Sequence, residues 1–342
     1  MIPVQNIYFM LSYAFKVLKE EHYKKVETEE CANAIELYAA ILERGVLQQV
    51  KRGMNRGYVQ RTETVSVPRG KIEVSQSIRE MTHIKKQIIC TYDEFAADTY
   101  LNRILKSTIT MLLRSDISID RKKKLRKLMK HFSDVELLDI RRINWHLQYN
   151  RNNQTYRMLI NVCYLIVHGL LQTENDGTMQ LMDFEKTEAF CRLYERFVYE
   201  YFKQEFPMLS VTKPHIGWQV DDGYVSLLPT MKTDMVLSDG ERHLIIDTKA
   251  YKRILQWNYD KATIYSHNLY QIFAYVKNYE LGADNNEVSG MLLYAQTATE
   301  EPINETYRMS GNKISVCTLD LGCHHTEIAR QLNEIVTNYF YL

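Results

Sequence analysis

Thr233–Tyr251 reads TDMVLSDGERHLIIDTKAY, and this stretch decides the fold because it predicts a β-hairpin that carries acidic residues. Two apolar runs, 235–237 and 244–246, flank a loop that contains Asp239–Gly240. Asp-Gly between apolar runs is a strong hairpin signal. The second run has the composition of a buried central strand. The hairpin therefore brings Asp234, which precedes the first strand, close to Asp247, which ends the second.

Two registers fit this hairpin. A loop centred on the Gly240–Glu241 bond places Asp234 directly opposite Asp247, whereas a two-residue turn at Asp239–Gly240 makes the two residues diagonal neighbours. In both registers the carboxylates lie on one face of the hairpin, roughly 5 to 8 Å apart. Side chains alternate between the faces of a strand, so Lys249 points the same way as Asp247.

Two carboxylates and a lysine at the end of a buried strand are costly as structure alone. Like charges side by side repel each other unless a positive group lies between them. A hard divalent cation that prefers oxygen ligands, Mg²⁺ or Mn²⁺, meets that need at Asp234 and Asp247. Lys249 is then placed to orient or deprotonate a water, or to stabilise developing negative charge. Two structural alternatives stay open: a solvated strand end, and an ion pair without a metal.

Composition places the chain among soluble globular proteins. Its 342 residues suggest two domains, and 45% hydrophobic and 25% charged residues are ordinary values. A net charge of +1 excludes a surface that coats polyanions throughout, but it allows a local basic groove. The start of the chain lacks the basic region of a signal peptide, and no apolar run is long enough to span a membrane. We therefore expect a cytoplasmic protein without membrane contact.

The six cysteines show no C-x-x-C spacing, which indicates reduced thiols. The string Cys323-His324-His325 resembles a set of metal ligands. It lacks a distant partner cluster, however, and we interpret it as a loop.

The first half of the chain is predicted to be mostly helical. Apolar residues recur at helical spacing over residues 6–18, 30–49, 95–113 and 155–171. Between the second and third of these helices, residues 59–67 and 72–78 alternate around a turn at Pro68–Lys71, which predicts a small, exposed β-hairpin projection.

Two features complete the organisation of this half. Arg121–Lys127 is the most basic run, and it indicates either a solvated helix face or a contact with phosphates or with an acidic partner surface. Glu174–Gly177 has the composition of a linker. We therefore divide the chain into domains 1–176 and 177–342.

The second half predicts a mixed sheet flanked by helices. The helix 187–203 is strongly amphipathic, and the helix 266–281 connects the hairpin to a strand at 289–295. A helix between two strands is a crossover that joins parallel neighbours. The remaining predicted elements are strands at 216–220, 224–228 and 314–319 and a helix at 327–339.

This order of helix, three strands, helix and strand, with D…D-x-K on the central hairpin, resembles the core of the PD-(D/E)xK nuclease superfamily. Gln271 and Tyr275 match the Q-x-x-x-Y element of its RecB-like branch. They are four residues apart and therefore share a helix face, from which they reach the DNA or the active-site loop.

A closer resemblance involves the N-terminus. Residues 2–14, IPVQNIYFMLSYA, resemble the I-P-V-x-N-I-Y-x-M-L-x-Y-A motif of the McrC family, the nuclease subunits of McrBC modification-dependent restriction systems. Further matches lie at 102–108, 227–234 and 267–271, so the resemblance spans nearly the whole chain. Thr233 stands where the superfamily has a proline, a departure that costs little because that proline has no chemical role.

The resemblance implies an endonuclease site. Asp234 and Asp247 would bind Mg²⁺ together with the carbonyl of Thr248, and Lys249 would assist the water that cuts the phosphodiester. Some members of the superfamily add a glutamate from a helix. Glu195 and Glu200 both flank the apolar stripe of helix 187–203, and helical phase does not choose between them; we place Glu195 in the site.

The resemblance also implies a partner. The N-terminal half of the McrC family docks on a hexameric AAA+ GTPase, McrB, and stimulates its hydrolysis of GTP. McrB binds the nucleotide and reads the methylated cytosine in double-stranded DNA, so this chain has no need to hold DNA alone. The alternative is a catalytically inert interaction subunit that activates an NTPase motor, an interpretation that the long N-terminal half motivates.

Overall fold

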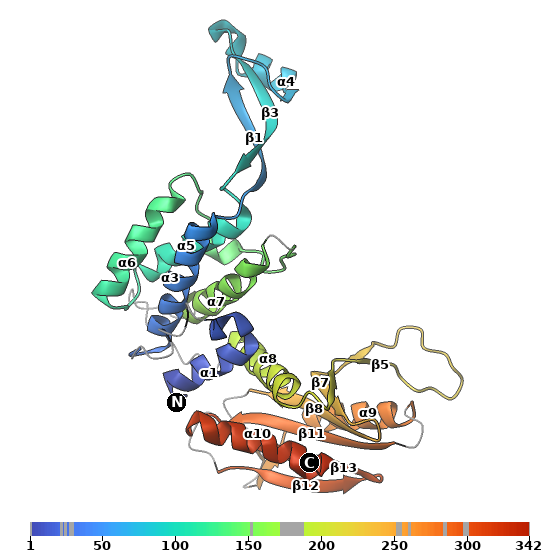
Figure 1. Cartoon of the computed structure of the whole chain (residues 1–342). Helices are drawn as coiled ribbons and strands as arrows, with labels where there is room; N and C mark the ends of the chain where they lie inside the picture. The colour runs from blue at the N-terminus through green and yellow to red at the C-terminus, as the bar shows by residue number, and fades with distance from the viewer. Residues whose placement is uncertain are drawn as a thin grey trace. The chain divides into compact units, whose positions relative to one another are not determined.

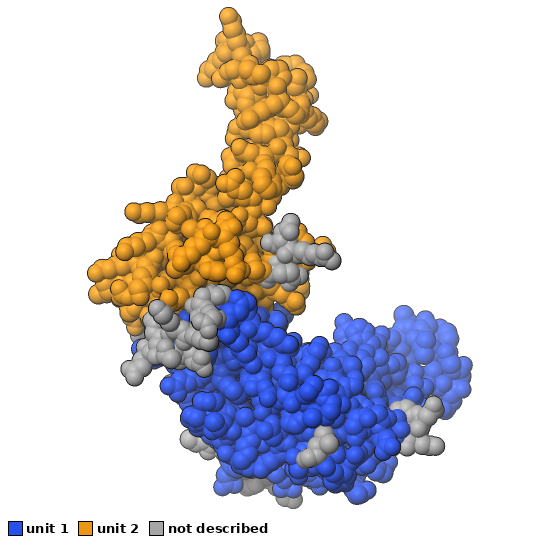
Figure 2. Space-filling view, viewed as in Figure 1, with its two compact units in different colours: residues 1–34, 182–342 blue, residues 35–181 orange. Residues whose placement is uncertain are grey.

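A computed structural model divides the chain into two units, residues 35–181 and residues 1–34 together with 182–342 (Figure 2). Its helices and mixed sheet confirm the predicted combination of a mostly helical part with a mixed sheet flanked by helices, an α+β or α/β class. The expected domain boundary between residues 176 and 177 lies outside the residues that the structure describes. These are residues 2–20, 23, 26, 31–150, 153–171, 188–250, 255–258, 261–282, 286–296 and 301–341.

The unit 35–181 is built on four long helices with buried apolar faces. Thr99 begins one of them by accepting a hydrogen bond from the backbone N–H of Asn102, and Ser118 begins another by accepting one from that of Arg121. Short 3₁₀ helices follow at Lys130–Phe132 (η4) and Ile140–Arg142 (η5). The long helices are α3 Ala34–Arg52, α5 Tyr100–Leu112, α6 Ile119–Met129 and α7 Gln154–Leu171.

A β-projection extends from these helices (Figure 1). It comprises β1 Gly57–Val65, β2 Lys71–Ile72 and β3 Ile88–Ala96, in the order β1-β3-β2, with α4 Val74–Arg79 and the 3₁₀ helix η3 Thr82–Lys85 between β2 and β3. The projection was predicted, but its strand pairing was wrong: β1 pairs with β3, and most of the expected strand 72–78 is helix.

The turn at Gly70 explains this difference in pairing. Gly70 has φ +68°, and a Cβ there would lie 2.4 Å from the carbonyl oxygen of Thr91 on β3. The chain therefore passes against β3, where β2 pairs, instead of returning along β1.

The second unit contains a six-stranded mixed sheet, in the order β12-β13-β11-β8-β7-β4. The strands β8, β11 and β13 are parallel, and the other pairings are antiparallel. The strands are β4 Ser210–Thr212, β7 Met235–Ser238, β8 Arg242–Lys249, β11 Glu287–Gln296, β12 Asn304–Met309 and β13 Asn312–Asp320. Two small ribbons accompany it: β5 His215–Ile216 with β6 Met231–Lys232, and β9 Leu255–Asn258 with β10 Lys261–Ile264.

Helices cover this sheet and connect its strands: α8 Glu188–Glu205, α9 Ser266–Glu280 and α10 His325–Phe340. As predicted, α9 is a crossover between the parallel strands β8 and β11. Ile245 of β8 packs in one core cluster with Ile272 and Val276 of α9. A Cβ on Gly290 of β11 would lie 2.7 Å from the side chain of Val276, so this glycine permits the close approach of α9 to the sheet.

The expected strand at 224–228 is wrong, and the one at 216–220 is reduced to His215–Ile216. Leu227 is 99% exposed and has φ +67°, a conformation that ends a strand. In the six-stranded sheet, the strand that joins β7 and β8 before α9 in the chain is instead β4, at the edge of the sheet. Apolar composition alone had suggested the strand, but this segment buries little of its apolar surface.

Residues 1–34 belong with the sheet and not, as expected, with the helical half. The helix α1 Val4–Ala14 lies beside α8 (Figure 1), where the ring centroids of Phe9 and Phe197 are 5.6 Å apart. The Tyr13 hydroxyl donates a hydrogen bond to Glu205 at 2.8 Å. Buried Asn6 donates to the carbonyl of Leu321 at 2.8 Å, after β13. Helical periodicity predicted α1 correctly, but it contained no information about the element on which α1 packs.

Candidate active site

The hairpin β7–β8 has the first of the two predicted registers. Met235 pairs with Ile246 and Ser238 pairs with His243, which leaves a four-residue loop at 239–242. By continuation of this register, Asp234 lies opposite Asp247. Asp247 lies two residues beyond Ile245 on the same strand, so its side chain points to the face that α9 covers.

Asp247 is a buried acid with a raised pKa. It is 2% exposed, and its Oδ2 lies 2.6 Å from Nζ of Lys249. Burial raises the pKa of Asp247 from the usual 3.8 to about 6; the Lys249 charge opposes this shift, and the negative charges of Asp234 and Glu195 add to it. The carboxylate thus lies among charges of both signs in a poorly solvated position, as functional acids do.

Thr248 holds the second carboxylate in place. Its backbone N–H and its hydroxyl both donate to Oδ2 of Asp234, at 2.8 and 2.7 Å. Sequence reasoning had considered only the Thr248 carbonyl and missed this donor role. The signal in the sequence was that a residue with a hydroxyl group follows Asp247, and Asp247 lies directly across the hairpin from Asp234.

Gln271 and Tyr275 of α9 lie on one helix face, as predicted, and they fix the lysine, a role that the sequence did not predict. Nζ of Lys249 donates to Oε1 of Gln271 at 2.9 Å, and Nε2 of Gln271 donates to the Tyr275 hydroxyl at 2.8 Å. That hydroxyl donates in turn to the carbonyl of Lys232 at 2.9 Å. The chain of hydrogen bonds holds the ammonium of Lys249 beside Asp247.

Glu195 lies at the edge of this group. Its carboxylate forms an ion pair with Lys213, and its charge contributes to the raised pKa of Asp247. Glu200 is five residues further along α8 and therefore points about 140° away around the helix. The structure brings together Asp234, Asp247, Thr248, Lys249, Gln271 and Tyr275, with Glu195 nearby but bound to a lysine.

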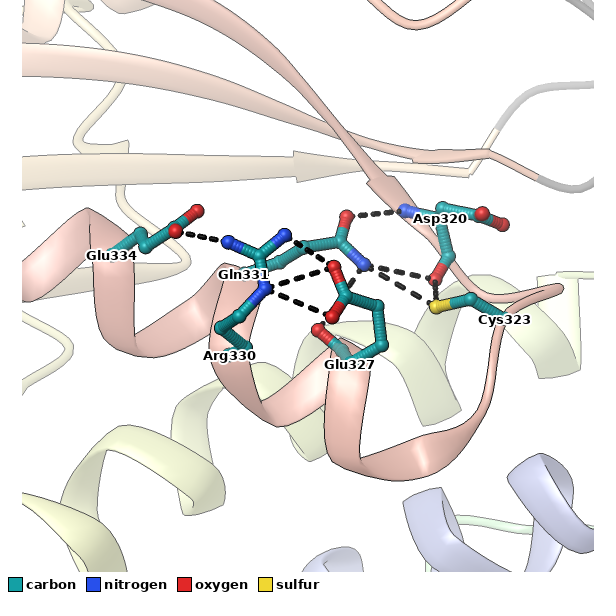
Figure 3. Close-up of polar contacts among 6 residues, drawn as sticks. All are labelled: Asp320, Cys323, Glu327, Arg330, Gln331 and Glu334. Carbon is teal, nitrogen blue, oxygen red and sulfur yellow. Dashed lines mark hydrogen bonds and ion pairs between the residues drawn. The ribbon is translucent and has the colours of Figure 1, made fainter.

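Cys323 lies just before α10 (Figure 3). His324 is the N-cap of that helix and His325 is its first residue. The thiol of Cys323 donates to the carbonyl of Asp320 at 3.0 Å, and Gln331 bonds to the backbone N–H of Asp320 at 3.0 Å. His324 accepts from a backbone N–H in the first turn of α10, and His325 packs its ring against α1. Within the described residues, no three His, Cys, Asp or Glu side chains cluster as metal ligands. The same residues contain no helix that is long and apolar enough to cross a membrane.

Comparison with known proteins agrees with the N-terminal motif. The model of the family "McrBC 5-methylcytosine restriction system component" matches residues 4–295. The type IV methyl-directed restriction enzyme EcoKMcrBC of Escherichia coli K12 is 30% identical over an alignment of 345 positions, which covers 99% of this chain and 98% of the relative.

Two solved structures from Thermococcus gammatolerans are similar to this chain. One is a half-complex from a tetradecameric assembly of McrB AAA+ hexamers with bound McrC, with TM-score 0.49, 18% identity, and coverage of 97% of this chain and 76% of that one. The other is the McrBC complex, with TM-score 0.40, 20% identity, and coverage of 59% of this chain and 58% of that one. The match to the family model and the E. coli relative confirm the predicted family: the chain belongs to the McrBC 5-methylcytosine restriction system components.

Proposed function

We propose that this chain is the metal-dependent endonuclease subunit of a methylcytosine-dependent restriction complex and that it hydrolyses phosphodiester bonds in DNA. The observation that supports this most is the group Asp234, Asp247 and Lys249, fixed by hydrogen bonds from Thr248 and to Gln271. The order α8, β4, β7, β8, α9, β11 supports a PD-(D/E)xK assignment. Membership of the McrBC family supplies the substrate class.

The donor set fits Mg²⁺ or Mn²⁺. Both cations take oxygen ligands, and Asp234, Asp247 and the carbonyl of Thr248 would hold the ion. Burial and the charge of Asp234 raise the pKa of Asp247 even though Lys249 lies beside it, and a bound cation would offset this cost of the negative charge. When bound, the ion would supply Lewis-acid stabilisation of phosphate charge and acidify a water.

The chain's own residues would then position the reaction. Lys249 presents a fixed ammonium that orients the attacking water and stabilises charge on the phosphate. Gln271 and Tyr275 prevent this ammonium from swinging away, and the bond from Tyr275 to the Lys232 carbonyl anchors them. Thr248 keeps Asp234 from turning out of the site. Glu195 would complete the site after leaving Lys213.

Recognition of the modified cytosine is assigned to a partner. We propose that residues 35–181 dock on a hexameric AAA+ GTPase of the McrB type in the cytoplasm, and that this partner binds GTP and reads the methylated DNA. The family and the name of the E. coli relative support a shared restriction system. The net charge of +1 also fits a nuclease that does not hold DNA by its whole surface.

Reconstitution tests this proposal. The chain is incubated with its partner, GTP and Mg²⁺ on methylated and unmethylated plasmids, and we expect cleavage of the methylated plasmid only. Stimulated GTP hydrolysis without cleavage of either plasmid would instead support the inert interaction subunit.

Metal binding is expected to depend on pH through Asp247. Mn²⁺ at one hundred times its dissociation constant stabilises a folded protein by about 2.7 kcal/mol. With a pKa of about 6, Asp247 is mostly ionised at pH 7.5, but at pH 5 a proton competes with the metal. The apparent affinity then falls about tenfold, and the stabilisation falls to about half. Thermal unfolding with and without Mn²⁺ at both pH values measures this, and an equal metal effect at pH 5 and 7.5 would argue against Asp247 as a ligand.

Thr248→Val is expected to slow cleavage about 10- to 100-fold, the range for partners that orient metal ligands. Valine keeps the branched shape but removes the 2.7 Å bond to Asp234. Thr248→Ser keeps the hydroxyl and should cut at nearly the wild-type rate. Initial rates of the reconstituted complex distinguish the two variants. Unchanged rates in the valine variant would show that the backbone N–H alone holds Asp234.

A further inference from the structure

The helix α6 and the η4 turn that follows it have two faces of opposite character. The inward face carries Arg121, Leu125, Leu128 and Phe132, all of them buried. Arg121 is neutralised there by ion pairs with two glutamates of α3. The outward face carries four exposed cations at i, i+3, i+4 and i+7, which we call the basic stripe: Lys123, Arg126, Lys127 and Lys130.

Within the described part of the chain, Asp120 acts on Lys123 through its charge, but its ion pair is with Lys124, which lies outside the basic stripe. Two other cations of this helix are paired: Lys124 lies 2.7 Å from Asp120, and Arg121 is buried against α3. Among the described residues, no ion pair involves a member of the stripe. Like charges three and four residues apart destabilise a helix. The repulsion within the stripe therefore works against the stability of α6, while the helix dipole favours Arg126 and Lys127 in its last turn.

The chemistry of the stripe favours phosphates over a protein surface. Lysine is depleted from protein–protein interfaces, where aromatic anchors are enriched; the stripe contains three lysines and no aromatic residue. Lys and Arg are the residues that contact DNA phosphates without reading sequence. From Lys123 to Lys130 the helix rises about 10 Å, a length along which duplex DNA carries about six charges.

The α6 helix also lies along the outer edge of the helical unit (Figure 1). Its net charge is strongly positive, whereas the whole chain has a net charge of only +1. We propose that the basic stripe binds the sugar–phosphate backbone of duplex DNA without sequence preference. This inference rests on the proposed function in one respect, that DNA is the substrate. It adds a second DNA contact, on the unit that does not contain the catalytic group.

The test is DNA binding without metal, so the result does not depend on whether the chain cuts. The full chain is titrated onto a labelled unmethylated duplex at several salt concentrations, and fluorescence anisotropy gives the affinity. We expect the variant K123Q/R126Q/K127Q/K130Q to bind about 10- to 100-fold more weakly at low salt. The slope of log affinity against log salt should become shallower by about 3 to 4, since each phosphate contact contributes about 0.9.

Two further variants separate charge at this site from charge in general. K16Q/K203Q/R308Q/R330Q removes four exposed cations of the other unit and should retain the wild-type affinity and slope. K123R/K127R/K130R keeps the charge of the stripe and should also bind like wild type. Equal losses in both glutamine variants would show that only net charge matters and would overturn the proposal.

Stimulation of the partner's GTP hydrolysis distinguishes a protein ligand from DNA. If the stripe variant loses stimulation while its DNA affinity is unchanged, the stripe binds an acidic protein surface and the proposal is overturned. If neither property changes, or if the wild-type chain shows no salt-dependent DNA binding, the stripe is a solvated face and the proposal is overturned as well. The plasmid cleavage assay tests the nuclease separately.

Discussion

Asp247→Asn is expected to abolish DNA cleavage by the reconstituted complex, with kcat lowered at least about a thousandfold. Metal catalysis contributes several kcal/mol of transition-state stabilisation, and each 1.36 kcal/mol is a factor of ten. Asparagine preserves the size of the side chain but removes the charge that would hold the cation in a position that is 2% exposed. Cleavage of methylated plasmid over time, in the presence of partner and GTP, measures the loss.

The same variant should remain folded. A carboxyl pKa raised from 3.8 to about 6 means that the folded state binds the proton more tightly than the unfolded state. Stability without metal therefore falls as pH rises from about 4 to 6, by roughly 3 kcal/mol in total. Asparagine avoids this cost, although Lys249 loses its ion pair, so urea unfolding at pH 7.5 should show stability equal to or above that of wild type.

Two comparisons make this result specific. Glu241→Gln changes an exposed carboxylate in the loop of the same hairpin and should leave cleavage intact. Stimulation of the partner's GTPase by Asp247→Asn should equal that of wild type, because the substitution is confined to the catalytic group. Cleavage at the wild-type rate by Asp247→Asn would show that the proposed site does not cut DNA.

The candidate active site was largely predictable because it depends on local geometry. Strand alternation placed Asp247 and Lys249 on one face, and both possible registers brought Asp234 near them. The choice of register depends on the loop, where the Asp239 carboxylate accepts from the backbone N–H groups of Glu241 and Arg242. Asp-Gly suits a two-residue turn equally well, so composition could not decide between the registers.

Other contacts could not be predicted from the sequence because they join segments that are far apart in the chain. The bond from Lys249 to Gln271 depends on how closely α9 approaches β8, and the packing of α1 on α8 joins residues about 190 positions apart. Periodicity shows that a helix has an apolar face but does not show which element covers it. Spacing alone left Gln271 without a defined partner and assigned α1 to the wrong half of the chain.

Arg121 shows the same limit within one helix. The sequence predicts for the run Arg121–Lys127 either a solvated helix face or a contact with phosphates or an acidic partner surface. In the structure its first residue is 2% exposed and points inward, whereas Arg126 and Lys127 point outward. Charge does not indicate burial when the acids that neutralise it come from another helix.

Arg121→Met is expected to destabilise the helical unit by about 3 to 5 kcal/mol, the usual cost of removing one member of a buried ion pair. Glu36 and Glu43 would remain almost buried, at 11% and 10% side-chain exposure, without their shared cation. Urea unfolding measures the loss, and Arg126→Met, the same change on the exposed face of α6, should stay within about 0.5 kcal/mol of wild type.

A rescue variant tests whether the cost comes from the two carboxylates. Adding Glu36→Gln and Glu43→Gln to Arg121→Met removes both uncompensated charges, and it should recover much of the lost stability, since an uncharged buried set can equal an ion pair. No recovery would mean that the bonds from Ser118 to Glu36, which tie the N-cap residue of α6 to α3, carry the stability instead. In that case Ser118→Ala alone should reproduce most of the loss. The comparison therefore separates neutralisation of buried charge from attachment of the start of α6, the helix that carries the basic stripe, to α3.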